Sequence, residues 1–175
     1  DAVRNQAQRE RYVVCNADEG EPGTFKDREV ILKRPHLLLE GLAIAAQTIE
    51  TKEIWIYVRG EFVKPIHILQ RAIDECYEAG IFGKRALGKD FELDVVLHRG
   101  AGAYICGEET GLLNSIEGKA GQPSLKPPFP AVEGLWASPT IVNNVESLSA
   151  LPDLIKMGVD SWIALGNEKN GGTKL

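Results

Sequence analysis

Three short segments of the chain have the apolar pattern of β-strands. Residues 12–16 form a largely apolar run that ends in acidic and turn-forming residues, as expected of a buried strand that delivers a loop. Residues 53–58 are rich in β-branched and aromatic side chains and stop before Gly60. Residues 91–98 alternate between apolar and polar positions and lead into the glycine-rich residues 99–104. We therefore predict a strand in each of the three segments.

Helical periodicity follows each predicted strand. In residues 36–50 the apolar side chains recur near helical spacing behind Pro35, and proline is favoured in the first turn of a helix. A second helical pattern runs from about residue 65 to residue 79 and stops at Gly80. A third covers residues 107–117 and carries carboxylates in its first turn, where the helix dipole favours them.

Strand, loop and helix thus recur three times, which is typical of a parallel α/β sheet covered by helices on both faces. Residues 118–139 are rich in Pro and Gly and are predicted to cross the surface in an extended form, before helices at about 144–156 and 160–165. Ligands of such sheets bind outside the carboxyl ends of the strands. The loops at residues 17–28 and 99–104 are therefore the candidate positions for chemistry.

The composition is that of a folded domain without a basic surface. With 43% hydrophobic and 26% charged positions, 175 residues can form one globular domain with a sizeable core. The net charge is −5, and the interspersed charges offer no basic stripe to nucleic acid. The longest apolar stretch, residues 37–46, is too short to span a bilayer, and no signal-peptide pattern is present at the start. We therefore expect a cytoplasmic protein.

The three cysteines, Cys15, Cys76 and Cys106, lie far apart and form no CxxC pair. Their odd number suits a reducing compartment and excludes a full disulfide framework. Iron–sulfur or zinc ligation by four cysteines within these residues is not supported.

The densest polar group follows the first predicted strand. Residues 16–28, NADEGEPGTFKDR, crowd four carboxylates, one amide, two cationic groups and two glycines together. Placing this much charge beside a buried strand is costly unless a ligand or partner satisfies it. The alternatives are a solvated acidic turn and a Mg²⁺ or Ca²⁺ site, although the spacing is not that of an EF-hand loop.

Two further groups follow later in the chain. Residues 100–110, GAGAYICGEET, join a flexible loop to a predicted helix start, where backbone N–H groups can hold a phosphate. Glu108 and Glu109 would repel a bare phosphate and are better suited to a neutral or cationic ring or to ribose hydroxyls. Residues 142–145, VNNV, supply two neighbouring amides that can donate to a ligand or, more commonly, cap a helix.

Four strings of the chain occur in an order typical of a known family. CNADEGEPGTFKDR, RGAGAYICGEET, LKPPFP and PTIVNNVES resemble motifs of the flavin- and NADH-binding subunit of respiratory complex I, the NADH:quinone oxidoreductase. The likeness extends over nearly the whole chain. Subunits that reduce NAD in bidirectional hydrogenases and formate dehydrogenases share much of the pattern. A diaphorase subunit of such a complex and a non-catalytic docking fragment are therefore the alternative interpretations.

The resemblance implies a Rossmann-like α/β domain that holds FMN, with NADH stacked over the flavin ring. It implies an NADH dehydrogenase subunit that accepts hydride on FMN and passes electrons to iron–sulfur clusters, with no side chain acting as acid or base. The positions implied to line the flavin are Asn16, Asp18, Glu19, Gly20, Tyr104, Gly107, Glu108, Glu109, Val142, Asn143 and Asn144. Those implied to contact the dinucleotide are Glu21, Glu109, Lys126 and Phe129.

The same resemblance implies a domain organisation and partners. Residues 1–170 would form the FMN- and NADH-binding domain, and residues 171–175 would begin a small ubiquitin-like domain. The family's glycine-rich loop is expected before residue 1, and its 4Fe-4S segment after residue 175. The implied partners are NADH, a thioredoxin-like 2Fe-2S subunit and other iron–sulfur subunits. They would assemble in a peripheral arm on the cytoplasmic side of the inner membrane, or the matrix side in mitochondria, with only indirect membrane contact.

Overall fold

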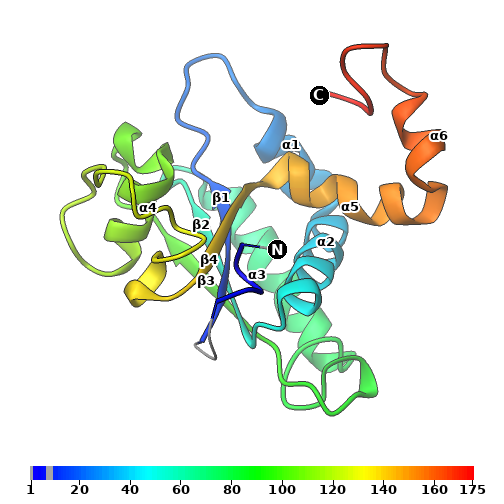
Figure 1. Cartoon of the computed structure of the whole chain (residues 1–175), viewed down its shortest axis with the longest axis horizontal. Coiled ribbons are helices and arrows are strands. Elements are labelled where there is room, and N and C mark those ends of the chain that lie inside the picture. Colours follow the sequence, from blue (N-terminus) through cyan, green and yellow to red (C-terminus); the bar gives the residue numbers. More distant parts are fainter. Residues whose placement is uncertain (1, 7–9) are drawn as a thin grey trace.

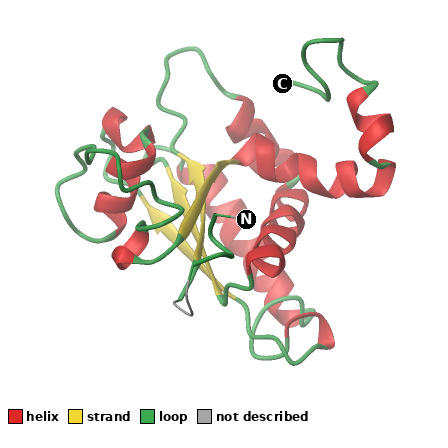
Figure 2. Cartoon of the chain, viewed as in Figure 1, coloured by secondary structure: helices red, strands yellow, loops and turns green. Residues whose placement is uncertain are grey.

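A parallel β-sheet forms the centre of the molecule. The computed structural model describes residues 2–6 and 10–175, so residues 1 and 7–9 of the predicted domain lie outside the described residues. Within this described part the sheet has four strands in the order β3-β2-β1-β4. Figure 2 shows the sheet in yellow, with red helices on either side. The strands are β1 Tyr12–Ala17, β2 Glu53–Val58, β3 Asp94–Arg99 and β4 Thr140–Asn144.

The register of the sheet brings the carboxyl ends of β1 and its two neighbours to one edge. Asn16 of β1 pairs with Tyr57 of β2 on one side and with Asn144 of β4 on the other. Because β1 lies between two strands and between two layers of helices, Val13 and Val14 on its opposite faces have no exposed surface. Burial on both faces explains why this strand is apolar at successive positions.

Helices cover both faces of the sheet, as predicted (Figure 1). One face packs against α2, α3 and α5 through side chains such as Val13 and Ile56, and the other packs against α4 through Val14 and Tyr57. The α-helices are α1 Lys26–Lys33, α2 Pro35–Ile49, α3 Val63–Glu78, α4 Glu109–Ile116, α5 Val145–Met157 and α6 Val159–Ile163. The α/β class and the parallel sheet predicted from the sequence are confirmed.

Two elements were not predicted, and β3 begins at Asp94, three residues after its predicted start. Strand β4 was not among the predicted strands, and its short run around Ile141 and Val142 is strand because it pairs with β1. Helix α1 begins at Lys26, inside residues 17–28, which were predicted to be a loop. The helix can begin there because the carboxylate of Glu19 accepts hydrogen bonds from backbone N–H groups of its first turn.

The remaining segments are largely irregular. Residues 118–134 contain no helix or strand, and a short 3₁₀-helix, Leu135–Ala137, interrupts the stretch that was predicted to be extended. Another 3₁₀-helix, Tyr104–Gly107, precedes α4, so α4 starts at Glu109 and not at residue 107. Residues 171–175 form neither helix nor strand. Among the described residues, no helix has the length and apolar character needed to cross a membrane.

Helices α2 and α5 cross so closely that one position requires glycine. A Cβ atom at Gly41 of α2 would lie 1.9 Å from the backbone oxygen of Leu148 in α5. Glycine weakens an isolated helix because it has more backbone freedom to lose on folding. Its presence here is therefore a requirement of the helix crossing and not of α2 itself.

We expect Gly41→Ala to lower the free energy of unfolding by about 1–3 kcal/mol, the usual range for overpacking. In an open helical position the same change stabilises a helix by roughly 0.5–1 kcal/mol. Chemical denaturation followed by circular dichroism measures the difference, and Gln47→Ala at an exposed position of α2 is the control. A Gly41→Ala protein as stable as the wild type would contradict the tight crossing.

Candidate functional site

A cavity of about 440 Å³ opens at the carboxyl edge of the sheet, beside the ends of β1 and β4. Its size is in the range of small-molecule sites, roughly 300–1,000 Å³. The end of β1, the loop at residues 18–25, the first turn of α1, the segment at residues 104–108 and the end of β4 contribute to its walls. The lining residues are Asn16, Asp18, Glu19, Gly20, Glu21, Thr24, Lys26, Asp27, Tyr104, Ile105, Gly107, Glu108 and Asn144.

Most of the residues predicted to bind a cofactor meet in this cavity. The two loops identified in the sequence face each other across it, although Glu21 and Tyr104 are 83 positions apart in the chain. The predicted residues in the lining are Asn16, Asp18, Glu19, Gly20, Glu21, Tyr104, Gly107, Glu108 and Asn144. The predicted residues outside the lining are Glu109, Lys126, Phe129, Val142 and Asn143.

Asn16 ties the two loops together at the base of the cavity. Its side-chain Nδ2 donates a hydrogen bond to the backbone oxygen of Gly107 at 2.8 Å, and its Oδ1 accepts one from the backbone N–H of Asp18 at 3.2 Å. A Cβ atom at Gly107 would lie only 3.2 Å from the backbone oxygen of Asp18. The absence of a side chain at Gly107 therefore allows the loops to approach this closely.

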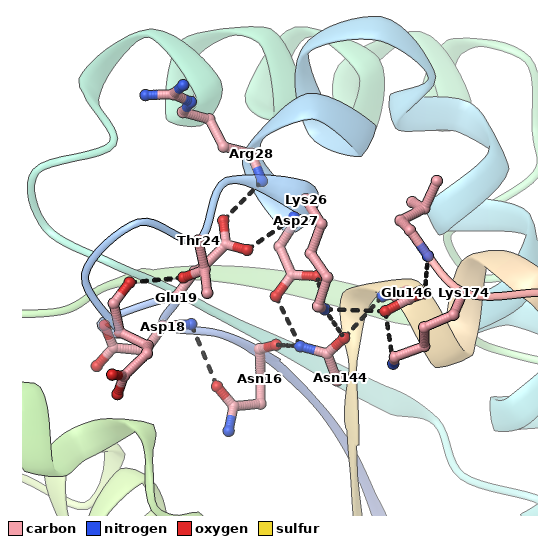
Figure 3. Close-up of polar contacts among 12 residues, drawn as sticks. Asn16, Asp18, Glu19, Thr24, Lys26, Asp27, Arg28, Asn144, Glu146 and Lys174 are labelled. Carbon is pink, nitrogen blue, oxygen red and sulfur yellow. Dashed lines mark hydrogen bonds and ion pairs between the residues drawn. The ribbon is translucent and has the colours of Figure 1, made fainter.

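Glu19 is a buried carboxylate, 7% exposed, that stabilises the start of α1 (Figure 3). The backbone N–H groups of Asp27 and Arg28 donate to its two carboxylate oxygens at 3.1 and 3.2 Å. The backbone oxygen of Glu19 also accepts a hydrogen bond from Arg59 at 2.8 Å. A carboxylate is favourable at a helix N-terminus because the free N–H groups there carry partial positive charge. Both carboxylate oxygens of Glu19 therefore already accept hydrogen bonds from within the protein.

Glu108 has the same role at the start of α4. Its Oε2 accepts hydrogen bonds from the backbone N–H groups of Thr110 and Gly111 at 2.8 and 2.9 Å, and Lys126 lies 3.2 Å from Oε1. Burial alone would raise the pKa of Glu108, but the hydrogen bonds from Thr110 and Gly111 and the Lys126 ammonium outweigh it and lower the pKa. The Glu108 carboxylate is therefore ionised at neutral pH.

Glu109, Lys126 and Phe129 lie outside the cavity lining. The Lys126 ammonium forms ion pairs with Glu108 and Glu109 and thereby joins α4 to the proline-rich segment. The side chain of Phe129 is 58% exposed. The Phe129 ring is therefore accessible at the surface outside the cavity, while Lys126 and Glu109 are paired with each other.

Tyr104 forms the rim opposite the acidic loop. Its hydroxyl donates to Oε2 of Glu21 at 2.6 Å, and this hydrogen bond raises the pKa of Tyr104. A Cβ atom at Gly20 would lie 3.1 Å from the Tyr104 ring. The glycine therefore lets the aromatic ring approach the acidic loop.

Side chains alternate between the two faces of a strand, so Asn143 of the VNN motif points away from the face of Val142 and Asn144. Val142 packs against the core beneath α4. Asn143 lines a separate cavity between α2 and α5, whose walls include Ile44 and Leu148. Asn144 faces the main cavity and also caps α5, since its Oδ1 accepts from the backbone N–H of Glu146.

The lining also contains Thr24, Lys26, Asp27 and Ile105, which were not among the predicted site residues. Lys26 and Asp27 belong to the predicted polar group, and their adjacent opposite charges were the available signal. Asp27 is only 2% exposed, which sequence position alone does not indicate. In the described part of the chain, no group of three or more His, Cys, Asp or Glu side chains is arranged to hold a metal ion.

Comparison with protein families identifies the cavity-bearing domain. Residues 2–153 match the sequence profile described as the Nuo51 FMN-binding domain. The chain belongs to the Nuo51 FMN-binding domain family. The family predicted from the four strings is thereby confirmed.

Relatives of this FMN-binding domain include subunits of NADH oxidoreductases. The chain is 52% identical to the mitochondrial NADH-ubiquinone oxidoreductase 51 kDa subunit of Aspergillus niger and 53% identical to an NADH-quinone oxidoreductase subunit of Rhodobacter capsulatus. Each comparison covers 95% of the chain but only 34% and 39% of those two proteins. A solved NAD⁺-reducing [NiFe]-hydrogenase in the H₂-reduced state matches with a TM-score of 0.89 and 38% identity, over 98% of this chain and 29% of that chain.

Asp18 is the lining carboxyl group of the FMN-binding domain with a raised pKa. Burial raises the pKa of Asp18 from 3.8 to about 6, against the opposing effect of Arg59 and with a further increase from Glu61. Because the pKa is higher in the folded state, the folded state holds more protons than the unfolded state between these values. The stability of the domain therefore falls as the pH rises from about 4 to about 6.

Replacing Asp18 by Asn removes this titration. We expect the difference in free energy of unfolding, Asp18→Asn minus wild type, to increase as the pH rises from about 4 to about 6. Above about pH 6 this difference should stay constant. Urea unfolding across this pH range measures the difference, and Glu40→Gln on the exposed surface of α2 controls for loss of one charge. An NMR titration that places the Asp18 carboxyl at its ordinary pKa would rule this explanation out.

Proposed function

We propose that this chain is the FMN- and NADH-binding part of the electron-input subunit of an NADH:quinone oxidoreductase. The observation that carries the proposal is the meeting of the two motif loops in one cavity at the carboxyl edge of the sheet. Relatives with 52% and 53% identity named as NADH oxidoreductase subunits support it. The activity is that of the whole subunit, since the chain spans only 34% and 39% of those relatives.

The lining of the cavity fits a flat, polar ring such as that of a flavin. Gly20 and Gly107 let the two loops that form its walls lie close together, since a side chain at either position would press against the opposite loop. The carboxylates of Asp18 and Glu21 can accept hydrogen bonds from ring N–H groups and hydroxyls. In the proposed site, Asn16, Asp18, Glu19 and Gly20 line one side, Tyr104, Gly107 and Glu108 the opposite side, and Asn144 the closing strand end.

FMN supplies the hydride-accepting chemistry when bound, and the residues of the chain orient the reactants. The exposed Phe129 ring offers an apolar face for stacking of the adenine. Lys126 offsets the charges of Glu108 and Glu109, so the phosphates of a dinucleotide meet less repulsion beside α4. Glu21 and Glu109 accept hydrogen bonds from hydroxyls of the dinucleotide, and no side chain needs to act as an acid or a base.

The proposal includes the assembly in which the subunit works. A multi-subunit oxidoreductase is supported by the complex I relatives and by the similar hydrogenase structure. Residues 1–170 would be the cofactor domain and residues 171–175 the start of a ubiquitin-like domain. Electrons would leave through a 4Fe-4S cluster of the whole subunit and a thioredoxin-like 2Fe-2S partner. The complex would lie in a peripheral arm on the cytoplasmic or matrix side of the membrane, and this subunit would contact the membrane only indirectly.

A second candidate function is that of a diaphorase subunit in an NAD-reducing hydrogenase. The fold match with a TM-score of 0.89 favours it, but the identity there is 38%, against 52% and 53% to the complex I subunits. A non-catalytic docking role is the third possibility, and it predicts that no flavin binds. Quinone reduction by the assembled complex, or hydrogen-dependent NAD⁺ reduction, distinguishes the first two.

The direct test is cofactor uptake and turnover by the whole subunit. We expect the purified subunit to take up FMN, to show flavin absorbance and to oxidise NADH with ferricyanide as electron acceptor. The controls are the subunit without added FMN and the heat-denatured subunit with added FMN. A folded subunit that takes up no FMN and oxidises no NADH would overturn the proposed function.

Phe129→Ala tests the proposed stacking contact. We expect the KM for NADH to rise roughly three- to tenfold, the scale of one aromatic stacking contact, with a smaller change in kcat. Steady-state kinetics of the whole subunit measures both constants. Ile155→Ala on α5 is the control because its side chain is similarly exposed, at 60% against 58%. An equal effect of the two substitutions would argue against stacking at Phe129.

A further inference from the structure

An ion cluster lies at the wall of the cavity, where α1, β4 and α5 meet (Figure 3). The Lys26 ammonium lies 2.7 Å from Oδ1 of Asp27, 2.8 Å from Oδ1 of Asn144 and 3.2 Å from Oε2 of Glu146. An ammonium group has three N–H donors. Each donor of Lys26 therefore has an acceptor within the protein.

The side chain of Asn144 is held at both of its polar atoms. Its Oδ1 accepts from Lys26 and, at 3.0 Å, from the backbone N–H of Glu146. Its Nδ2 donates to Oδ2 of Asp27 at 2.7 Å and lies 3.4 Å from the backbone oxygen of Asn16. Because one amide oxygen and two amide hydrogens have partners, the orientation of Asn144 in the cavity wall is determined by the cluster.

Burial makes this cluster sensitive to the loss of one member. Asp27 is 2% exposed, and Asn144 and Glu146 are partly buried. Burial lowers the pKa of Lys26, but the hydrogen bonds and attraction of Asp27 and Glu146 outweigh it and raise the pKa. Lys26 is therefore charged at neutral pH. Removing one partner of such a group leaves a poorly solvated charge, which costs more than the loss of an exposed ion pair.

A lysine beside a nucleotide site is commonly a phosphate ligand. Here a phosphate would have to displace Asp27, Asn144 or Glu146 from the ammonium, and two of these three are carboxylates that would repel it. Among the described residues, Lys26 is the cation paired with Asp27, whereas Glu146 is also paired with Lys174, which lies outside the cavity lining. The arrangement therefore favours an internal role for Lys26.

We propose that Lys26 is a positioning residue of the flavin pocket, which together with Asp27 and Glu146 orients Asn144 in the cavity wall and does not itself bind the ligand. The inference rests on the proposed function, since it takes FMN to be the ligand of this cavity. Through Asn144 the cluster also contacts the backbone of Asn16, whose side chain joins the two loops. Loss of the cluster would therefore disturb both sides of the pocket.

The test compares two ligands that differ only in a phosphate group. FMN and riboflavin are titrated into the flavin-depleted whole subunit, and the change in flavin fluorescence gives each dissociation constant. Lys26→Met and Glu146→Gln are expected to weaken both ligands by a similar factor, roughly tenfold, the scale of one charge-assisted hydrogen bond. Lys174→Gln is the control, because it removes only an exposed partner of Glu146 and should leave both constants unchanged.

Direct phosphate binding predicts the opposite pattern. Lys26→Met would then weaken FMN and leave riboflavin unchanged, and Glu146→Gln would tighten FMN because it removes a competing carboxylate. Either result overturns the inference. Lys26→Arg keeps the positive charge and the donors, and we expect it to retain most of the affinity for both ligands.

A second measurement needs no flavin and therefore separates this inference from the proposed function. The side-chain amide NMR signals of Asn144 are expected to be shifted from those of exposed asparagines in the wild type and in Lys174→Gln. In Glu146→Gln and Lys26→Met they should move towards the exposed values, and Glu146→Gln alone suffices if Lys26→Met does not fold. Unchanged Asn144 signals overturn the positioning role, whereas a wild type that binds no flavin overturns the proposed function.

Discussion

The parallel pairing of β1 with both of its neighbours is the constraint on which the rest of the structure depends. It requires that β1, β2 and β4 all end at one edge of the sheet. Strand β1 can occupy this central position because Val13 and Cys15 face the core of α2 and α5 while Val14 faces that of α4. The polar motif begins at Asn16, near the end of this buried strand. The cavity therefore forms at the transition from the core to the loops.

Much of the charge beside the cavity is balanced within the protein. Glu19 and Glu108 each accept hydrogen bonds from the first turn of a helix, α1 and α4 respectively. Lys126, in the proline-rich segment, pairs with Glu108 at the start of α4. The same residues that suggest a cofactor site thus also hold the two loops in place. This dual use explains how so many carboxylates can lie beside a buried strand, since charged groups near a core need partners.

Asp18 differs from these paired carboxylates. Burial raises its pKa to about 6, although Arg59 opposes the increase, so its charge changes just below neutral pH. A group that titrates near neutrality inside a ligand cavity links the charge of the site to pH. In the proposed flavin site, the charge of Asp18 would therefore change with pH just below neutrality.

The local elements were largely predictable because their signals come from neighbouring residues. Helix α2 follows from the spacing of its apolar side chains, and β2 from its β-branched and aromatic run, and both lie within a residue or two of the predicted limits. Strand β4 was not predicted because five residues carry little periodicity of their own. Helix α1 was missed because its first turn is stabilised by Glu19, several residues earlier in the loop.

The sequence by itself determined the α/β class, the family and the two loops that carry most of the polar groups. Only the tertiary structure decided which of these residues share one cavity. It brought Asn144 to within hydrogen-bonding distance of Asn16 and Asp27, which lie 128 and 117 positions earlier, and directed Asn143 to the opposite side of the sheet. The physical reason is that strand pairing is a long-range interaction. The pairing of β4 with β1 fixes which side chain of the VNN motif reaches the cavity, and no local pattern encodes that partner.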